Sequence, residues 1–200
     1  MVDPRKTLVC LLLGAGLVAC GDEEPRSAAQ DAQAPRTLWD ALGTVSYDFP
    51  VYGTVPGLVD ASDLAVVGDV VDVRAGKTLG APDTPDAVQT SHLVIDVERV
   101  LQARPGHRPR QVVLAMTTPM GQDAASLAEL AAAQEQSIFL LTETGSPELY
   151  GPTSGDGIVI ATATGAAFPL VEGETTALTE ASRGSSLQEV AARVRAAGAR

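Results

Sequence analysis

The chain has 200 residues, a formal net charge of −11 and a hydrophobic content of 45%, with only 4% aromatic residues. This length fits one ordinary domain with a flanking segment, because a domain usually has about 100–200 residues. The acidic balance argues against binding to nucleic acid or directly to anionic lipid head groups, since both repel a negatively charged surface.

The first twenty residues have the pattern of an export signal. Two basic residues precede an apolar run over 8–19, and this run is shorter than the roughly 20 apolar residues that span a bilayer. The run leads into Leu17-Val18-Ala19-Cys20, which resembles the lipobox of bacterial lipoproteins, whose cysteine is lipidated and becomes the first mature residue. The resemblance implies that residues 1–19 are a lipoprotein signal peptide and that Cys20 carries the lipid.

The alternative is an ordinary signal peptide that leaves Cys20 as a free thiol, but Gly21 and the polar segment after it favour lipidation. The other cysteine, Cys10, lies within the predicted signal peptide, so no disulfide is expected within the mature chain. Two or more acyl chains anchor a protein stably. We therefore expect a protein of the bacterial cell envelope, held to the membrane through lipid on Cys20 and facing the periplasm or the cell exterior.

Residues 20–37 are predicted to form a flexible tether after the lipidated cysteine. The stretch holds no large apolar residue and is rich in Pro, Ser, Gln, Ala and acidic residues. Such a composition buries too little surface to offset the entropy of ordering. A linker of this length has a mean reach of about 20–25 Å.

Residues 38–57 form an aromatic-rich segment that contains Trp39, Tyr47, Phe49 and Tyr52. One interpretation is that an irregular N-terminal segment wraps the domain and buries these rings, because each brings a large apolar area. The other is that the four rings form a binding surface for a glycan or a partner protein. The turn-forming residues Pro50, Gly53, Pro56 and Gly57 argue against a regular element here.

Residues 58–200 are predicted to form a mainly β domain. Alternating or β-branched patterns predict strands over Leu64–Arg74, His92–Leu101 and Gln111–Thr117. A glycine inside the first of these, Gly68, predicts a bulge. The apolar run 137–142 predicts a buried strand, 148–151 and 157–164 predict a hairpin, and the polar residues 75–89 predict a long loop.

Two helices are expected within the domain. Alanines and leucines over 126–134 favour a short helix. At the C-terminus, Ser186 and Glu189 have the spacing of a capping box, apolar residues follow at helical intervals, and Gly198 ends the run. The predicted fold is a small OB-like barrel or sandwich of five to six strands, with this amphipathic helix packed outside.

Three strand-like segments resemble those of small exported bacterial domains similar to the netrin or tissue-inhibitor-of-metalloprotease OB-type barrel; they are residues 61–73, 94–101 and 136–141. The resemblance implies an OB-type fold, which commonly supports binding rather than chemistry. The metalloprotease inhibitors chelate the protease metal through a Cys-x-Cys at the mature N-terminus. The chain has no Cys-x-Cys, so inhibition is not implied.

The sequence carries no motif of zinc hydrolases, of serine hydrolases or of phosphate-binding loops. The histidines His92 and His107 are interpreted as solvated side chains. Three loop aspartates lack the spacing of a calcium loop; they are Asp83, Asp86 and Asp156. Asp156, between two glycines, is interpreted as a turn residue. Four arginines are interpreted as salt-bridge partners, with an anionic-ligand site as the alternative; they are Arg99, Arg104, Arg108 and Arg110.

Two functions compete at this point. The first is a non-catalytic binding domain for a protein or glycan, with no catalytic residue, metal or cofactor. The alternative is an envelope hydrolase that uses His92 with Asp96 and a serine placed by the fold. A catalytic base must lie within hydrogen-bond reach of its nucleophile, and two histidines offer few such arrangements. We therefore expect binding.

Overall fold

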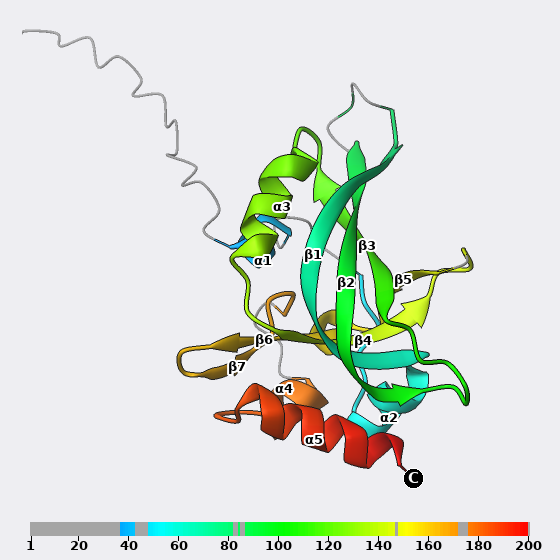
Figure 1. The fold of residues 1–200 in the computed structure, drawn as a ribbon, viewed down its shortest axis with the longest axis vertical. Coiled ribbons are helices and arrows are strands. Elements are labelled where there is room, and N and C mark those ends of the chain that lie inside the picture. The colour runs from blue at the N-terminus through cyan, green and yellow to red at the C-terminus, as the bar shows by residue number, and fades with distance from the viewer. Residues whose placement is uncertain are drawn as a thin grey trace, which may run out of the picture. The chain divides into compact units, whose positions relative to one another are not determined.

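The computed structural model describes residues 37–42, 48–81, 84, 87–146, 148–171 and 176–199. Seven strands form one sheet in the order β1-β2-β3-β5-β4-β6-β7, and an additional pairing of β1 with β4 closes the first five into a barrel (Figure 1). The strands are β1 Leu64–Leu79, β2 Val88–Ala103, β3 Gln111–Pro119, β4 Ser137–Glu143, β5 Leu149–Pro152, β6 Ile158–Thr162 and β7 Gly165–Ala167. The helices are α1 Leu38–Leu42, α2 Val55–Ala61, α3 Ala124–Ala132, α4 Ala177–Ala181 and α5 Leu187–Gly198, with a short 3-10 turn, η1, at Gly155–Gly157.

This architecture confirms the predicted fold class, an OB-like barrel with a C-terminal helix. The ladders β1–β2, β2–β3 and β1–β4 are antiparallel, whereas β3 and β5 pair in parallel. The five-stranded Greek-key barrel of the OB type has this form. Strands β6 and β7 extend the sheet beyond the barrel; β6 corresponds to the strand predicted within 157–164, whereas β7 was not predicted.

The predicted bulge in β1 is present at Gly68. The register between β1 and β2 shifts between Val67 and Gly68, and it shifts again between Val70 and Asp72. A Cβ atom on Gly68 would lie 2.2 Å from the carbonyl oxygen of Asp96. Glycine is therefore required where β1 bends tightly over β2 to enter the barrel wall.

The barrel interior is the first of two hydrophobic cores. Alternate residues of β2 and β3 point into it, among them Leu93, Ile95 and Leu114. Helices α1 and α3 also contribute to this core, and the ring of Trp39 from α1 lies 6.2 Å from that of Phe139 on β4, centroid to centroid. Closing the barrel therefore depends on side chains from outside the sheet.

The second core lies on the other side of the barrel wall. Outward residues of β1, β4 and β6 pack there against helices α2, α4 and α5, and the buried members include Ala65, Val67, Ile138, Leu140, Val159, Leu178, Val190 and Val194. Strand β4 is consequently buried on both faces from Ser137 to Leu141. This double burial explains its uninterrupted apolar run, and it confirms the buried strand predicted there.

The C-terminal helix α5 begins as predicted. Ser186 and Glu189 form the capping box: the Ser186 backbone N–H donates to the Glu189 carboxylate at 2.8 Å, and the Glu189 N–H donates to Ser186 Oγ at 3.3 Å. Its buried residues Val190, Ala191 and Val194 belong to the second core. The short helix predicted over 126–134 is also present, as α3, two residues earlier than expected because Asp123 caps it.

The predicted long loop over residues 75–89 is wrong. Strand β1 continues to Leu79 and β2 begins at Val88, so only residues 80–87 connect them. Polar side chains join the ladder here: Thr90 Oγ1 accepts a hydrogen bond from the Lys77 N–H at 2.7 Å. A pattern rule that looks for apolar alternation misses strands whose ends are polar on both faces.

The predicted hairpin between 148–151 and 157–164 is also wrong. Both segments contain strands, but these pair with β4 and not with each other. Strand β5 pairs with residues Leu141–Glu143 of β4, and β6 pairs with residues Ser137–Phe139. Between them the chain passes around Leu140, whose carbonyl oxygen accepts the Thr153 N–H at 3.0 Å. The intervening turn residues therefore carry the chain along one edge of β4 and do not reverse it.

Residues 38–57 contain regular structure, contrary to the expectation. Leu38–Leu42 form α1, and α2 begins at Val55 with Thr54 as its N-cap; Pro56 lies in the first turn. Proline is tolerated there because the N–H that it lacks has no partner within the helix. Pro56 and Gly57 thus lie at the beginning of a helix. The prediction failed here because it treated proline and glycine only as residues that break helices.

Candidate functional site

The outward side of β2 and β3 is the surface on which OB-type barrels commonly bind their ligands. Side chains alternate along a strand, so the neighbours of the inward Leu93 and Ile95 point outward. In register across the two strands are His92 with Ala115, Val94 with Val113, and Asp96 with Gln111. These six residues are called the outer face below.

The outer face has an apolar middle and a polar end. Val94 is buried, so the accessible apolar surface comes from Val113 and Ala115, both of intermediate exposure. Asp96 and Gln111 are exposed and are joined by a hydrogen bond of 2.8 Å from Gln111 Nε2 to Asp96 Oδ1.

The helices that contact these strands do so elsewhere. Helix α5 reaches β2 at Gln102, where a Cβ on Gly198 would lie 2.8 Å from Gln102 Cγ, and α1, which contacts β3, places its buried side chains in the barrel core. The described helices therefore leave Asp96 and Gln111 open to solvent, and Val113 and Ala115 partly open.

The structure does not bring together the residues of the hydrolase hypothesis. His92 and Asp96 lie four residues apart on one extended strand, which separates their Cα atoms by about 13 Å. Asp96 instead accepts its hydrogen bond from Gln111, and His107 contacts Tyr150. In the described part of the chain, neither histidine hydrogen-bonds to a serine or a carboxylate.

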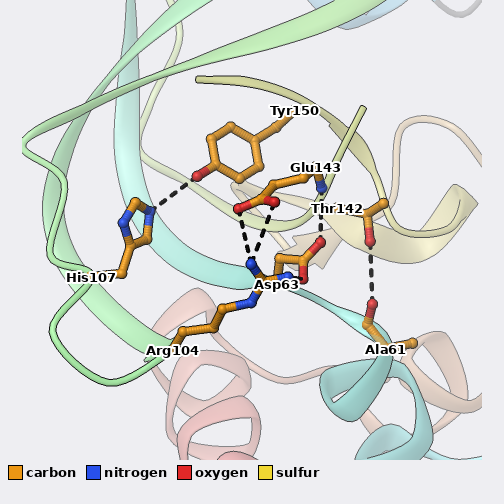
Figure 2. A network of polar contacts seen from close by, with 7 residues as sticks. All are labelled: Ala61, Asp63, Arg104, His107, Thr142, Glu143 and Tyr150. Carbon is orange, nitrogen blue, oxygen red and sulfur yellow. Dashed lines mark hydrogen bonds and ion pairs between the residues drawn. The ribbon is translucent and has the colours of Figure 1, made fainter. Parts of the chain in front are cut away.

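A polar network lies at one end of the barrel, where β1 begins and β4 ends (Figure 2). Arg104, which follows β2, forms ion pairs with Asp63 and with Glu143, the latter at 3.4 Å. Asp63 Oδ2 also accepts the backbone N–H of Glu143 at 2.9 Å. The carboxylate of Asp63 and, to a smaller extent, that of Glu143 raise the pKa of Arg104. Arginine is protonated in any case.

The same end of the barrel holds a histidine and a tyrosine. His107, in the loop between β2 and β3, has its Nε2 3.0 Å from the hydroxyl of Tyr150, whose ring is buried in the barrel core (Figure 2). Burial, and then the nearby Glu143 and Asp63, raise the pKa of the Tyr150 hydroxyl. Tyr150 is therefore neutral at physiological pH, and this contact ties the loop to the barrel wall.

The network has the properties of a structural clasp. It joins the loop before β1, the loop after β2 and the end of β4, which come from distant parts of the sequence. The Arg104 side chain is 60% exposed, so solvent screens its ion pairs and each contributes little to stability. Arg104 is a salt-bridge partner, as expected from the sequence. Sequence reasoning did not single out Asp63, Glu143 or Tyr150, because nothing in their local patterns shows that they meet.

Among the four aromatics of the proposed binding surface, Trp39 is buried, with 2% of its surface exposed, so its ring belongs to the core. The prediction of a binding role for Trp39 is therefore corrected, because its ring fills the barrel interior and does not lie on a surface. Phe49 and Tyr52 are of intermediate exposure, and Tyr52 packs against the second core. Tyr47 lies outside the described residues, as do Cys20, Asp83 and Asp86.

Comparison of the chain with models of protein families, with curated proteins and with solved structures gives no match. Within the described ranges, no three His, Cys, Asp or Glu side chains are grouped to hold a metal ion. None of the helices that the structure describes is long and apolar enough to cross a membrane.

Asp156 lies in the η1 turn, as expected of a turn residue, but it is buried and accepts a hydrogen bond from Ser154 Oγ.

Proposed function

We propose that this chain is an envelope lipoprotein, anchored through lipid on Cys20, whose OB-like barrel binds a protein or a glycan without catalysis. The observation that supports this function best is the outer face: partly open apolar side chains with exposed polar ones beside them, on the side of the barrel where OB-type domains bind. Protein interfaces combine an apolar centre with a polar rim in the same way.

The shape of the outer face favours an extended partner. Small-molecule sites are concave and enclose most of their ligand, whereas Val113 and Ala115 lie on the outward side of a strand ladder. An open strand surface of this kind suits a protein segment or a glycan chain that lies across several strands. Asp96 and Gln111 would supply the hydrogen bonds that orient it.

Anchoring is tested by metabolic labelling with a fatty-acid analogue in a bacterial host. We expect the wild-type chain to take up the label and Cys20→Ser to take up none. A variant Cys10→Ser controls for general effects of removing a thiol from the N-terminal segment. Label retained by Cys20→Ser would contradict lipidation at this residue.

Binding is tested by placing a photoreactive amino acid at Ala115 and, as a control, at Glu129, an exposed residue of α3 away from the outer face. We expect cross-links to an envelope component from position 115 and none from 129. A protein partner shifts the band by its own mass, whereas a glycan gives a shift that a glycosidase removes. Cross-linking of equal strength from both positions would contradict the outer face as the binding surface.

The hydrolase alternative is tested with the same full-length protein. Hydrolysis of envelope esters, amides or glycosides that is lost in His92→Ala or His107→Ala would replace the binding proposal. When the photoreactive residue at position 115 is combined with either substitution, we expect the cross-link to be retained. The cross-link should be weaker with His92→Ala, because this substitution removes one side chain of the outer face.

A further inference from the structure

A small cleft separates α5 from β2 and is unrelated to the outer face. Its walls are Arg99 of β2 and four residues of α5: Gln188, Ala191, Ala192 and Arg195. Its volume is about 220 Å³, below the roughly 300–1,000 Å³ of sites for drug-sized ligands. The two alanines leave the space open, and the arginines approach it from opposite elements.

The two arginines of the cleft have no counter-charge within the described residues. The ion pairs there belong to Arg74 and Arg104, and neither Arg99 nor Arg195 takes part in one. The neighbouring carboxylates are engaged: Glu98 accepts from Gln136 Nε2, and Glu189 caps its own helix.

Arg99 carries a second, independent indication. Its Nε is buried, and no described group accepts a hydrogen bond from it. Leaving a buried charged donor without an acceptor is unfavourable, because the donor loses its hydration and gains nothing in return. An acceptor from outside the described residues would satisfy this donor.

We propose that this cleft binds a phosphate monoester group. Such a group carries a charge of about −1.5 to −2 at neutral pH, which matches two arginines, and it offers three acceptor oxygens. Guanidinium groups bind phosphate through paired hydrogen bonds, and the amide of Gln188 provides a further donor at the wall. The cleft admits the phosphate and the atoms next to it, so the rest of the ligand lies outside.

The net charge of the protein does not prevent this binding. At physiological ionic strength the screening length is about 8 Å, so distant carboxylates act weakly on an anion in the cleft. The two arginines that line it act at contact distance. Affinity should fall as salt is raised, because both ligand and site are charged.

The direct test is calorimetric titration of the full-length protein with inorganic phosphate in a phosphate-free buffer. We expect saturable binding that is weakened about tenfold or more in Arg99→Gln and in Arg195→Gln, the loss expected for one charged hydrogen bond. Arg193→Gln is the matched control, because it removes the same charge from α5 without touching the cleft. Acetate should bind more weakly than phosphate.

Two further measurements separate the outcomes. Thermal unfolding shows whether Arg99→Gln is folded; if it is not, Arg195→Gln decides, since this side chain is exposed. Glycerol phosphate, and vesicles of phosphatidylcholine with and without phosphatidic acid, distinguish a soluble ester from a lipid head group. Absence of saturable phosphate binding, or equal loss in Arg193→Gln, would overturn the proposal, and neither result bears on cross-linking at Ala115.

Discussion

Gly68 is the residue at which the barrel wall has no space for a side chain. A Cβ there would meet the Asp96 carbonyl oxygen at 2.2 Å and Ile95 Cγ2 at 2.9 Å. We predict that Gly68→Ala lowers the free energy of unfolding by about 1–3 kcal/mol, because backbone atoms must move apart. Denaturant titration measures the loss. Gly53→Ala, where no atom lies within 4 Å, is the control and should change stability little; equal effects would show that the contact at Gly68 relaxes freely.

Trp39 shows how burial decides the role of an aromatic residue. Its ring packs in the barrel core beside Phe139, so we predict that Trp39→Ala lowers the free energy of unfolding by about 3–5 kcal/mol. Trp39→Phe keeps a ring in place and should cost clearly less. If Trp39→Ala left stability unchanged and abolished partner binding, the ring would act at the surface after all.

At the scale of the element, the N-terminus of α5 makes stability depend on pH. Hydrogen bonds from the Ser186 backbone, and then from its hydroxyl, lower the pKa of the Glu189 carboxyl below its ordinary value. The folded state thus binds this proton less readily than the unfolded state. The stabilisation is fully present above the ordinary carboxyl pKa of about 4.3 and is lost as the pH falls through the lowered folded value.

We predict from this that Glu189→Gln reduces the dependence of the melting temperature on pH between about pH 5 and pH 3. Thermal unfolding followed by circular dichroism across this range gives the slope for each protein. Glu129→Gln on α3, which caps no helix, is the control and should keep the slope of the wild-type chain. An unchanged slope in Glu189→Gln would mean that the capping bond is absent in solution.

For the whole molecule, two cores share the same barrel wall. Strands β1 and β4 bury side chains into the barrel on one face and against α2, α4 and α5 on the other. Neither core is complete without these two strands. The barrel and the helical layer should therefore unfold together.

We predict a single cooperative transition in which Leu114→Ala, in the barrel core, and Leu140→Ala, in the second core, each lower stability by about 2–5 kcal/mol. Near-ultraviolet circular dichroism reports on Trp39 in the first core, and far-ultraviolet circular dichroism reports on the helices. The two signals should give coincident curves in both variants. Separate midpoints in either variant would show that the helical layer unfolds independently.

The sequence by itself determined the elements whose signals are local. The cap Ser186 with Glu189 depends on a spacing of three residues, the bulge at Gly68 on one residue type, and the burial of β4 on a continuous apolar run. Each involves contacts within a few positions of the chain or a preference that holds in any context. The fold class followed because strands of this number and spacing have few ways to bury their apolar faces.

Tertiary structure alone decided which distant residues meet. The ladder partners of β5 and β6 and the clasp of Asp63, Arg104 and Glu143 are set by barrel closure, to which a local pattern is blind. The same closure placed Trp39 in the core and separated Arg104, paired at the barrel end, from Arg99, unpaired beside α5. Local composition records which side chains are charged or aromatic, but the free energy of each depends on burial and partners, and only the folded chain supplies these.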